Sequence, residues 1–181
     1  MITVWENSPH IMIIHSKKLI FIHIPKSGGT SIKESYARTF KPNIDFEKIS
    51  NFPPYIEKDG LQAWHFSYWD AIDIHPDYEY ITQVRHPVNR WVSYYKMIRE
   101  FHNEPYSFEE FTDKFLGVRF TTQQFKWVGE CEVHRLEDKT IWKRLGIPER
   151  KDNVTTISVE VSQYHRQKIE EYFAEDMRKW Y

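Results

Sequence analysis

Short apolar runs alternate with segments of helical spacing along the chain. The runs IMIIH (11–15) and LIFIHI (19–24) predict strands, either paired as a hairpin or with the first at a sheet edge. The second run is apolar almost throughout, as is typical of a strand covered on both faces of a parallel sheet. Residues 30–40 then place apolar side chains at helical spacing. This order predicts a strand that leads directly into a helix.

The rest of the chain repeats the alternation. Ser67 is a candidate N-cap, Pro87 a candidate first helical residue, and Ser107 with Glu110 has the spacing of a capping box. We expect strands at 61–66, 79–85 and 132–138, a loop at 41–60, a helix that ends near Leu145, and helices at 67–73, 88–101, 108–116 and, for the most part, 158–181.

Strands that alternate with helices indicate the α/β class. We expect a three-layer, P-loop-type fold in which helices flank a central, mainly parallel sheet. No linker divides the sequence, so residues 1–181 are expected to form a single domain.

Composition narrows the classes of partner. The 181 residues are 40% hydrophobic and 28% charged with a formal net charge of −1, which is typical of a globular protein and argues against nucleic acid as the partner. The single cysteine, Cys131, excludes an intramolecular disulfide. Neither a signal peptide nor a membrane span is recognisable, so a cytoplasmic location is expected.

The segment PKSGGTS follows the strand predicted at 19–24. A strand that passes through glycines into a helix directs backbone N–H groups and the positive end of the helix dipole to one point, where an anion binds. Lysine and hydroxyl side chains add donors. The candidate residues are Lys26, Ser27, Gly28, Gly29, Thr30 and Ser31. The lysine precedes the glycines, unlike the Walker A order, and an ordinary strand–turn–helix joint stays possible on this segment alone.

A second candidate anion site lies in VRHPVNRWVSYY. Arg85 ends the strand predicted at 79–85, and Ser93 follows eight positions later inside the next helix. Ligands of open α/β sheets bind beyond the carboxyl ends of the strands, where Lys26 and Arg85 would both lie. Singly, Arg85 is equally compatible with a surface ion pair and Ser93 with an ordinary helix surface. Together with the glycine segment they indicate a ligand that carries phosphates at both ends.

These two segments resemble the cofactor signatures of the sulfotransferases, and are especially similar to the carbohydrate O-sulfotransferase branch that includes heparan sulfate 2-O-sulfotransferase. The tail YHRQKIEEYFAEDMRKWY and the segment EVHRLED also resemble that family, so the likeness spans about residues 19 to 181. It implies 3′-phosphoadenosine-5′-phosphosulfate (PAPS) as the donor. The glycine segment would then hold the 5′-phosphosulfate, and Arg85 with Ser93 the 3′-phosphate.

The resemblance also implies roles in catalysis. Sulfuryl transfer to a hydroxyl needs a base and a group that stabilises the leaving oxygen. We assign the base to His65 and the stabilising group to Lys26, without a metal. Related branches use a glutamate, so a carboxylate near His65 stays an alternative: Glu57, Asp59 or Asp70. The acceptor is expected to be a glycan or another small hydroxyl compound. A P-loop kinase or NTPase, and a catalytically inactive nucleotide-binding relative, are the rival interpretations.

Overall fold

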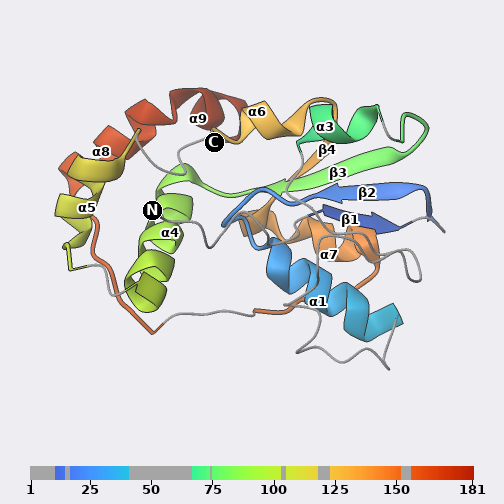
Figure 1. Ribbon diagram of the computed structural model, residues 1–181, viewed down its shortest axis with the longest axis horizontal. Helices are drawn as coiled ribbons and strands as arrows, with labels where there is room; N and C mark the ends of the chain where they lie inside the picture. Colours follow the sequence, from blue (N-terminus) through green and yellow to red (C-terminus); the bar gives the residue numbers. More distant parts are fainter. Residues whose placement is uncertain are drawn as a thin grey trace.

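A four-stranded sheet in the order β1-β2-β3-β4 forms the centre of the fold (Figure 1). The computed structural model describes residues 11–14, 17–40, 67–73, 75–102, 105–117, 123–151 and 156–181. The strands are β1 (Ile11–Ile14), β2 (Leu19–Ile22), β3 (Glu79–Val84) and β4 (Glu132–Arg135). β1 pairs antiparallel with β2, whereas β2, β3 and β4 are mutually parallel. The sheet is therefore mainly parallel, as the sequence predicts.

The register brings the carboxyl ends of the parallel strands to one edge. Ile22 pairs with Thr82, and Val84 pairs with Arg135. The Thr82 hydroxyl also donates to the carbonyl of Ile22 at 2.7 Å. The segments that follow β2 and β3 consequently start side by side, which is where an open α/β sheet binds ligands.

Helices cover both faces of the sheet. α1 (Gly29–Phe40) and α7 (Thr140–Leu145) pack on one face through a core that includes Phe21, Ile32 and Ile141. α3 (Tyr68–Ile72) covers the other face, where Tyr68 packs near Ile20. α6 (Phe125–Val128) and α9 (Ala174–Trp180) lie on the same side as α3 (Figure 1). The three-layer α/β arrangement is thereby confirmed.

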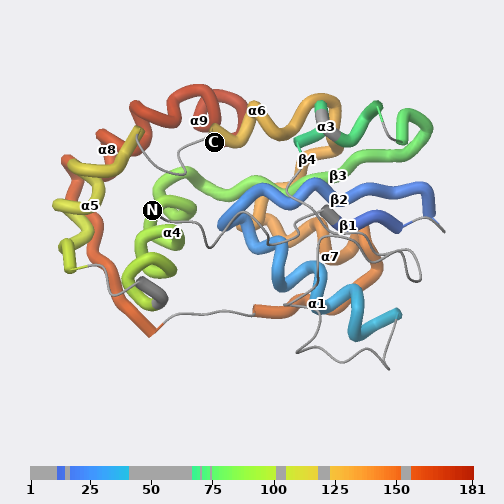
Figure 2. Tube along the Cα trace, in the orientation of Figure 1, coloured from blue at the N-terminus to red at the C-terminus, as the bar shows by residue number. Residues whose placement is uncertain are grey.

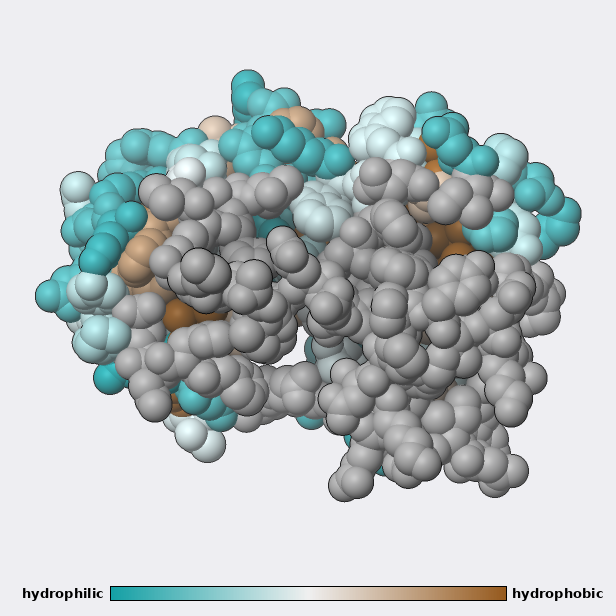
Figure 3. Space-filling view, in the orientation of Figure 1, coloured by the Kyte–Doolittle hydropathy of each residue, from teal (hydrophilic) through white to brown (hydrophobic). Residues whose placement is uncertain are grey.

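A group of helices extends beyond the carboxyl edge of the sheet. It consists of α4 (Pro87–His102), α5 (Phe108–Phe115) and α8 (Gln163–Tyr172), which share an aromatic core that includes Trp91, Phe111 and Ile169. Figure 2 shows the red C-terminal helices running from this group back to α6. The outer surface of α8 and α9 is hydrophilic (Figure 3). Because α4 starts directly after β3, this group stands beside the expected ligand-binding edge.

Most predicted elements lie within two residues of their expected bounds. β1 and β2 form the hairpin with β1 at the edge, α4 starts at Pro87, and Ser107 and Glu110 make both hydrogen bonds of a capping box. The predicted strand 132–138 is shorter and gives way to a 3₁₀ turn at Leu136–Asp138, because its partner β3 ends at Val84, opposite Arg135. The expected strand at 61–66 and loop at 41–60 lie outside the described residues.

The C-terminal helix predicted at 158–181 is also modified. It begins only after Ser162, whose hydroxyl accepts from the N–H of His165, and it breaks into α8 and α9 at the buried Phe173. The break turns α9 towards α6. Among the helices of the described segments, none combines the length and the apolar character needed to cross a bilayer.

Candidate anion-binding site

The glycine segment leaves β2 in a backbone conformation that is fixed by its neighbours. Lys26 adopts a left-handed φ of +67°, which costs a non-glycine residue about 1 kcal/mol or more. Its carbonyl accepts from Arg85 Nη1 at 3.3 Å, and the carbonyl of Pro25 accepts from Arg90 Nε at 3.0 Å. Two arginines from the β3–α4 segment therefore hold the turn.

The two glycines of the segment meet different demands. Gly28 has a φ of +84°, a region that glycine occupies without strain. Gly29 has no positive φ, but a Cβ there would lie 2.1 Å from Cδ2 of the buried His23. The first residue of α1 can thus approach the end of β2 only as glycine.

The amino end of α1 supplies backbone donors. The N–H of Ile32 donates to the carbonyl of Gly28 at 3.4 Å, so the N–H groups of residues 29–31 precede the first hydrogen bond of the helix. Thr30 is half-buried and Ser31 is buried. Such a helix start, with its positive dipole end, suits a phosphate-like group.

Lys26 and Arg85 form a pair of neighbouring cations. Burial and, to a smaller extent, the charge of Arg85 lower the pKa of Lys26 to about 8, although the charge of Glu100 opposes that shift. Burial likewise lowers the pKa of Arg85, although Glu137 and Tyr181 oppose that shift. Two partly desolvated positive charges that repel each other are stabilised when an anion binds between them.

The segment that carries Arg85 is fixed on its other side by the C-terminal residue. His86 donates its backbone N–H to Glu137 Oε1 at 3.0 Å, and the Tyr181 hydroxyl donates to Glu137 Oε2 at 2.9 Å. The rings of His86 and Tyr181 meet edge to face at 4.9 Å between centroids. Arg85 is therefore presented by a well-anchored backbone.

Ser93 is half-buried in the second turn of α4. Trp91 and Tyr94 on that helix point into the aromatic core, whereas Ser93 lies on another face, which it shares with Glu100 seven residues later. The charge of Glu100 acts on Lys26. Arg90 of the same helix donates its Nε to the carbonyl of Pro25, whereas a direct contact of Ser93 with the cofactor stays a prediction.

Ser27 is buried and is engaged by the protein itself. Its hydroxyl donates to Gln124 Oε1 at 3.1 Å, its N–H donates to the carbonyl of Ile24 at 3.2 Å, and its carbonyl accepts from Gln83 Nε2 at 2.5 Å. In this structure Ser27 holds the loop in place. Its direct contact with a cofactor stays a prediction.

Gln124 is a residue of the candidate site that sequence reasoning missed. It is fully buried before α6 and contacts both Ser27 and the backbone of Arg85. Its surroundings, QQFKWVG, match no motif with a known spacing, and glutamine is not a typical catalytic residue. The sequence indicates a role for Gln124 only if its segment is considered together with the AED sequence of the tail, which supplies Asp176.

The candidate base and two of its alternatives cannot be placed. His65, Glu57 and Asp59 lie outside the described residues, and Asp70 lies in α3. Within the described ranges, no group of three or more His, Cys, Asp and Glu side chains is arranged to hold a metal ion. The cation pair and the helix start are the chemical features that the structure brings together.

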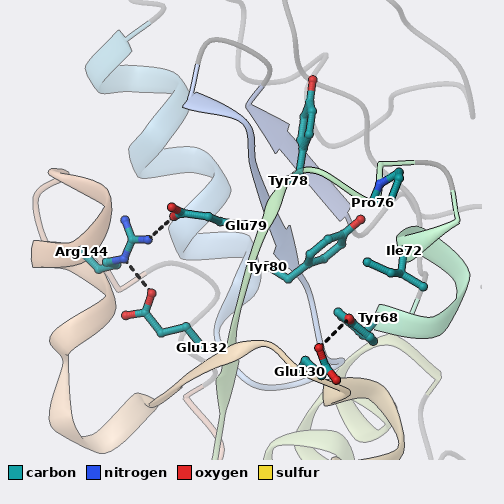
Figure 4. A pocket seen from close by; sticks show the side chains of 9 residues that line it. All are labelled: Tyr68, Ile72, Pro76, Tyr78, Glu79, Tyr80, Glu130, Glu132 and Arg144. Carbon is teal, nitrogen blue, oxygen red and sulfur yellow. Dashed lines mark hydrogen bonds and ion pairs between the residues drawn. The ribbon is translucent and has the colours of Figure 1, made fainter.

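A hollow lies at the opposite, amino end of β3 and β4 (Figure 4). It measures about 530 Å³, and Tyr68, Tyr80 and Glu130 are among its lining residues. Among the described residues that line it, Arg144 is the one cation, and it pairs with Glu79 at 2.7 Å and Glu132 at 2.8 Å. Because that arginine is already neutralised, this hollow does not compete with the glycine segment as an anion site.

Comparisons with known proteins identify the family of this chain. A crystal structure of a sulfotransferase from Alicyclobacillus acidocaldarius is similar with a TM-score of 0.43 and 16% identity, over 89% of this chain and 83% of that one. A likeness at that level adds nothing to the assignment, and a comparison with curated proteins finds no match. The family model described as "Sulfotransferase family" matches residues 9–128, about two thirds of the 181 residues, and this range includes both candidate anion-binding segments. The chain therefore belongs to the sulfotransferase family.

Proposed function

We propose that this protein transfers a sulfuryl group from PAPS to a hydroxyl group of a carbohydrate or another small acceptor. The observation that carries the proposal is the pair Lys26 and Arg85, partly buried side by side at the carboxyl edge of β2 and β3. Placing two cations there costs free energy that an anionic ligand offsets. The donor nucleotide, the acceptor class and the residue roles go beyond family membership and belong to the proposal.

The two phosphate ends of such a donor fit two parts of the site. The start of α1, with Lys26, offers donors for the 5′ end, and Arg85 with Ser93 offers a fork and a hydroxyl for the 3′-phosphate. When bound, the nucleotide supplies an activated sulfuryl group. Lys26 stabilises the negative charge that develops at the leaving oxygen, and His65 removes the proton of the acceptor hydroxyl.

Phosphoryl transfer is the rival chemistry in a fold of this type. Here Lys26 precedes the glycines, whereas the Walker A lysine follows them, and β3 is followed by Arg85 where a magnesium-binding carboxylate would stand in that class. The sulfotransferase family match supports the sulfuryl alternative.

Nucleotide preference tests the proposal. Adenosine 3′,5′-bisphosphate should raise the melting temperature in the presence of EDTA, and ATP with magnesium should not. Stabilisation by ATP with magnesium alone would exclude the sulfuryl donor. Sulfate transfer from labelled PAPS to a panel of sugars then separates an active enzyme from an inactive relative, and persistence of full activity in His65→Ala would remove His65 as the base.

The role of Lys26 is tested by separating turnover from binding. Lys26→Ala should lower the rate of sulfate transfer by a larger factor than the affinity for adenosine 3′,5′-bisphosphate, because the charge at the leaving oxygen develops only during transfer. Weaker binding with an unchanged rate would make Lys26 an anchor only.

A further inference from the structure

One buried amide joins the two anion-binding segments. Gln124 Oε1 accepts from Ser27 Oγ at 3.1 Å and from the backbone N–H of Arg85 at 2.9 Å. Its Nε2 donates to the carbonyl of Arg85 at 2.9 Å. A single side chain thereby bridges the glycine segment and the end of β3.

Asp176 of α9 fixes the position of that amide. Its Oδ2 accepts the backbone N–H of Gln124 at 2.8 Å and lies 3.5 Å from Gln124 Nε2, and its Oδ1 accepts the N–H of Phe125 at 2.9 Å. Asp176 is fully buried. Charge-assisted hydrogen bonds of this kind in a buried place are strong and hold a fixed geometry. They also give Asp176 of the AED sequence a structural role that the proposed chemistry does not use.

Arg90 adds a second link between the same parts. It is buried in α4, and its Nε donates to the carbonyl of Pro25 at 3.0 Å. Burial lowers its pKa to about 10, and the nearby charge of Asp176 opposes that shift. The glycine segment is consequently tied at Pro25 and Ser27 to one support that is built from α4, α6 and α9.

We propose that Gln124, held by Asp176, sets the separation of the two phosphate-binding groups and so determines the preference for a nucleotide phosphorylated at both ends. A ligand with two anions gains from the second site only if both sites keep the spacing of the ligand. The polar atoms of Gln124 are engaged by the protein, so it acts through Ser27 and Arg85 as a positioning residue. This inference rests on the proposed function.

The test compares two nucleotides in one titration series. The dissociation constants of adenosine 5′-monophosphate and adenosine 3′,5′-bisphosphate are measured by calorimetry at fixed salt. The constant of the monophosphate divided by that of the bisphosphate gives the preference for the second phosphate. Gln124→Met keeps the length of the side chain and removes its hydrogen bonds. We expect it to lower the quotient about tenfold or more, the factor carried by one charge-assisted contact, with little change for the monophosphate.

A matched control separates positioning from loss of stability. Thr112→Val removes the acceptor of the Trp91 Nε1 hydrogen bond, 3.0 Å long, in the aromatic core of α4 and α5. It should lower the melting temperature and leave the quotient unchanged. If Gln124→Met shows the same quotient as the wild-type protein, the positioning role is wrong and the proposed function is unaffected. A wild-type protein that does not prefer the bisphosphate would overturn both.

A second variant keeps the inference testable if Gln124→Met does not fold. In Gln124→Glu, a protonated carboxyl can replace the amide, whereas a carboxylate would face the carbonyl of Arg85 and the carboxylate of Asp176. Relative to wild type at each pH, the quotient of this variant should be near normal at pH 5 and lowered at pH 8. An equal quotient at both pH values would refute the role of Gln124.

Discussion

The close approach of Gly29 to His23 gives a sharp test of how the glycine turn after β2 is built. In Gly29→Ala, the new Cβ would lie 2.1 Å from His23 Cδ2 and 2.4 Å from both Cγ and Nε2. Carbon atoms pack at about 3.5 Å, so the ring would have to withdraw by about 1.4 Å. His23 is only 4% exposed, which leaves the ring little room to do so.

Two opposing free energies decide whether Gly29→Ala stabilises or destabilises the protein. Alanine in place of glycine stabilises a helix interior by up to about 1 kcal/mol, and by less at a first helical residue. Overpacking a well-packed site costs typically about 1–3 kcal/mol. We therefore expect a net loss near 2 kcal/mol, which for a chain of this size lowers Tm by roughly 4–8 °C. The displaced turn should also weaken nucleotide binding, because the backbone donors of α1 move with it.

Thermal unfolding and nucleotide titration of four variants measure this: Gly29→Ala, His23→Ala, the double variant and Gly146→Ala. Gly146→Ala serves as the matched control, since no atom lies within 4 Å of its added Cβ and only its φ of +71° is unfavourable. Gly146→Ala should lower the free energy of unfolding by about 1 kcal/mol and leave nucleotide binding unchanged. The double variant His23→Ala/Gly29→Ala should be more stable than the sum of the single changes predicts. A Gly29→Ala protein as stable as wild type, or strictly additive changes, would refute the steric explanation.

Three further predictions concern charge and capping. Arg85→Ala should weaken the binding of adenosine 3′,5′-bisphosphate far more than that of adenosine 5′-phosphosulfate. Equal losses of affinity in a titration would refute the role of Arg85 at the 3′-phosphate. Because the pKa of Lys26 in the free protein is about 8, its cation is lost above that value, and the affinity for adenosine 5′-phosphosulfate should fall between pH 7 and 9.5. Lys26→Met should abolish that dependence. Burial also lowers the pKa of Lys33 to about 8, so Lys33→Met is the control. If Lys33→Met abolishes the pH dependence of affinity and Lys26→Met does not, the assignment of that dependence to Lys26 is wrong. Ser107→Ala should cost about 1 kcal/mol, or roughly 2–4 °C in Tm, by removing the cap of α5, and an unchanged melting curve would show that the cap contributes nothing.

Local sequence signals predicted most of the elements because each signal acts over a few residues. Pro87 starts α4, and the Ser107–Glu110 pair closes the capping box. The end of β4 was misjudged because a strand lasts only as long as its partner. β3 stops at Val84, and that is a property of the sheet. The break at Phe173 was missed for a similar reason, since burial of this ring between helices decides it.

The candidate site divides in the same way. The glycine segment and Arg85 were recognisable because their donors act close to their own positions in the chain. Gln124 was not, because its function depends on three partners from separate parts of the sequence: Ser27, Arg85 and Asp176. Placement of the base at His65 stays a prediction, since this residue lies outside the described segments.

The sequence by itself determined the α/β class, the strand that opens through a glycine turn into a helix, and a second cationic segment after another strand. It could do so because periodicity, glycine positions and helix starts are short-range properties of a chain. Only the tertiary structure decided that Lys26 and Arg85 become one electrostatic unit, and that Gln124 and Asp176 link the segments that carry them through hydrogen bonds. Burial and hydrogen bonds between remote segments exist only once the sheet has set its register and the C-terminal helix has packed against it.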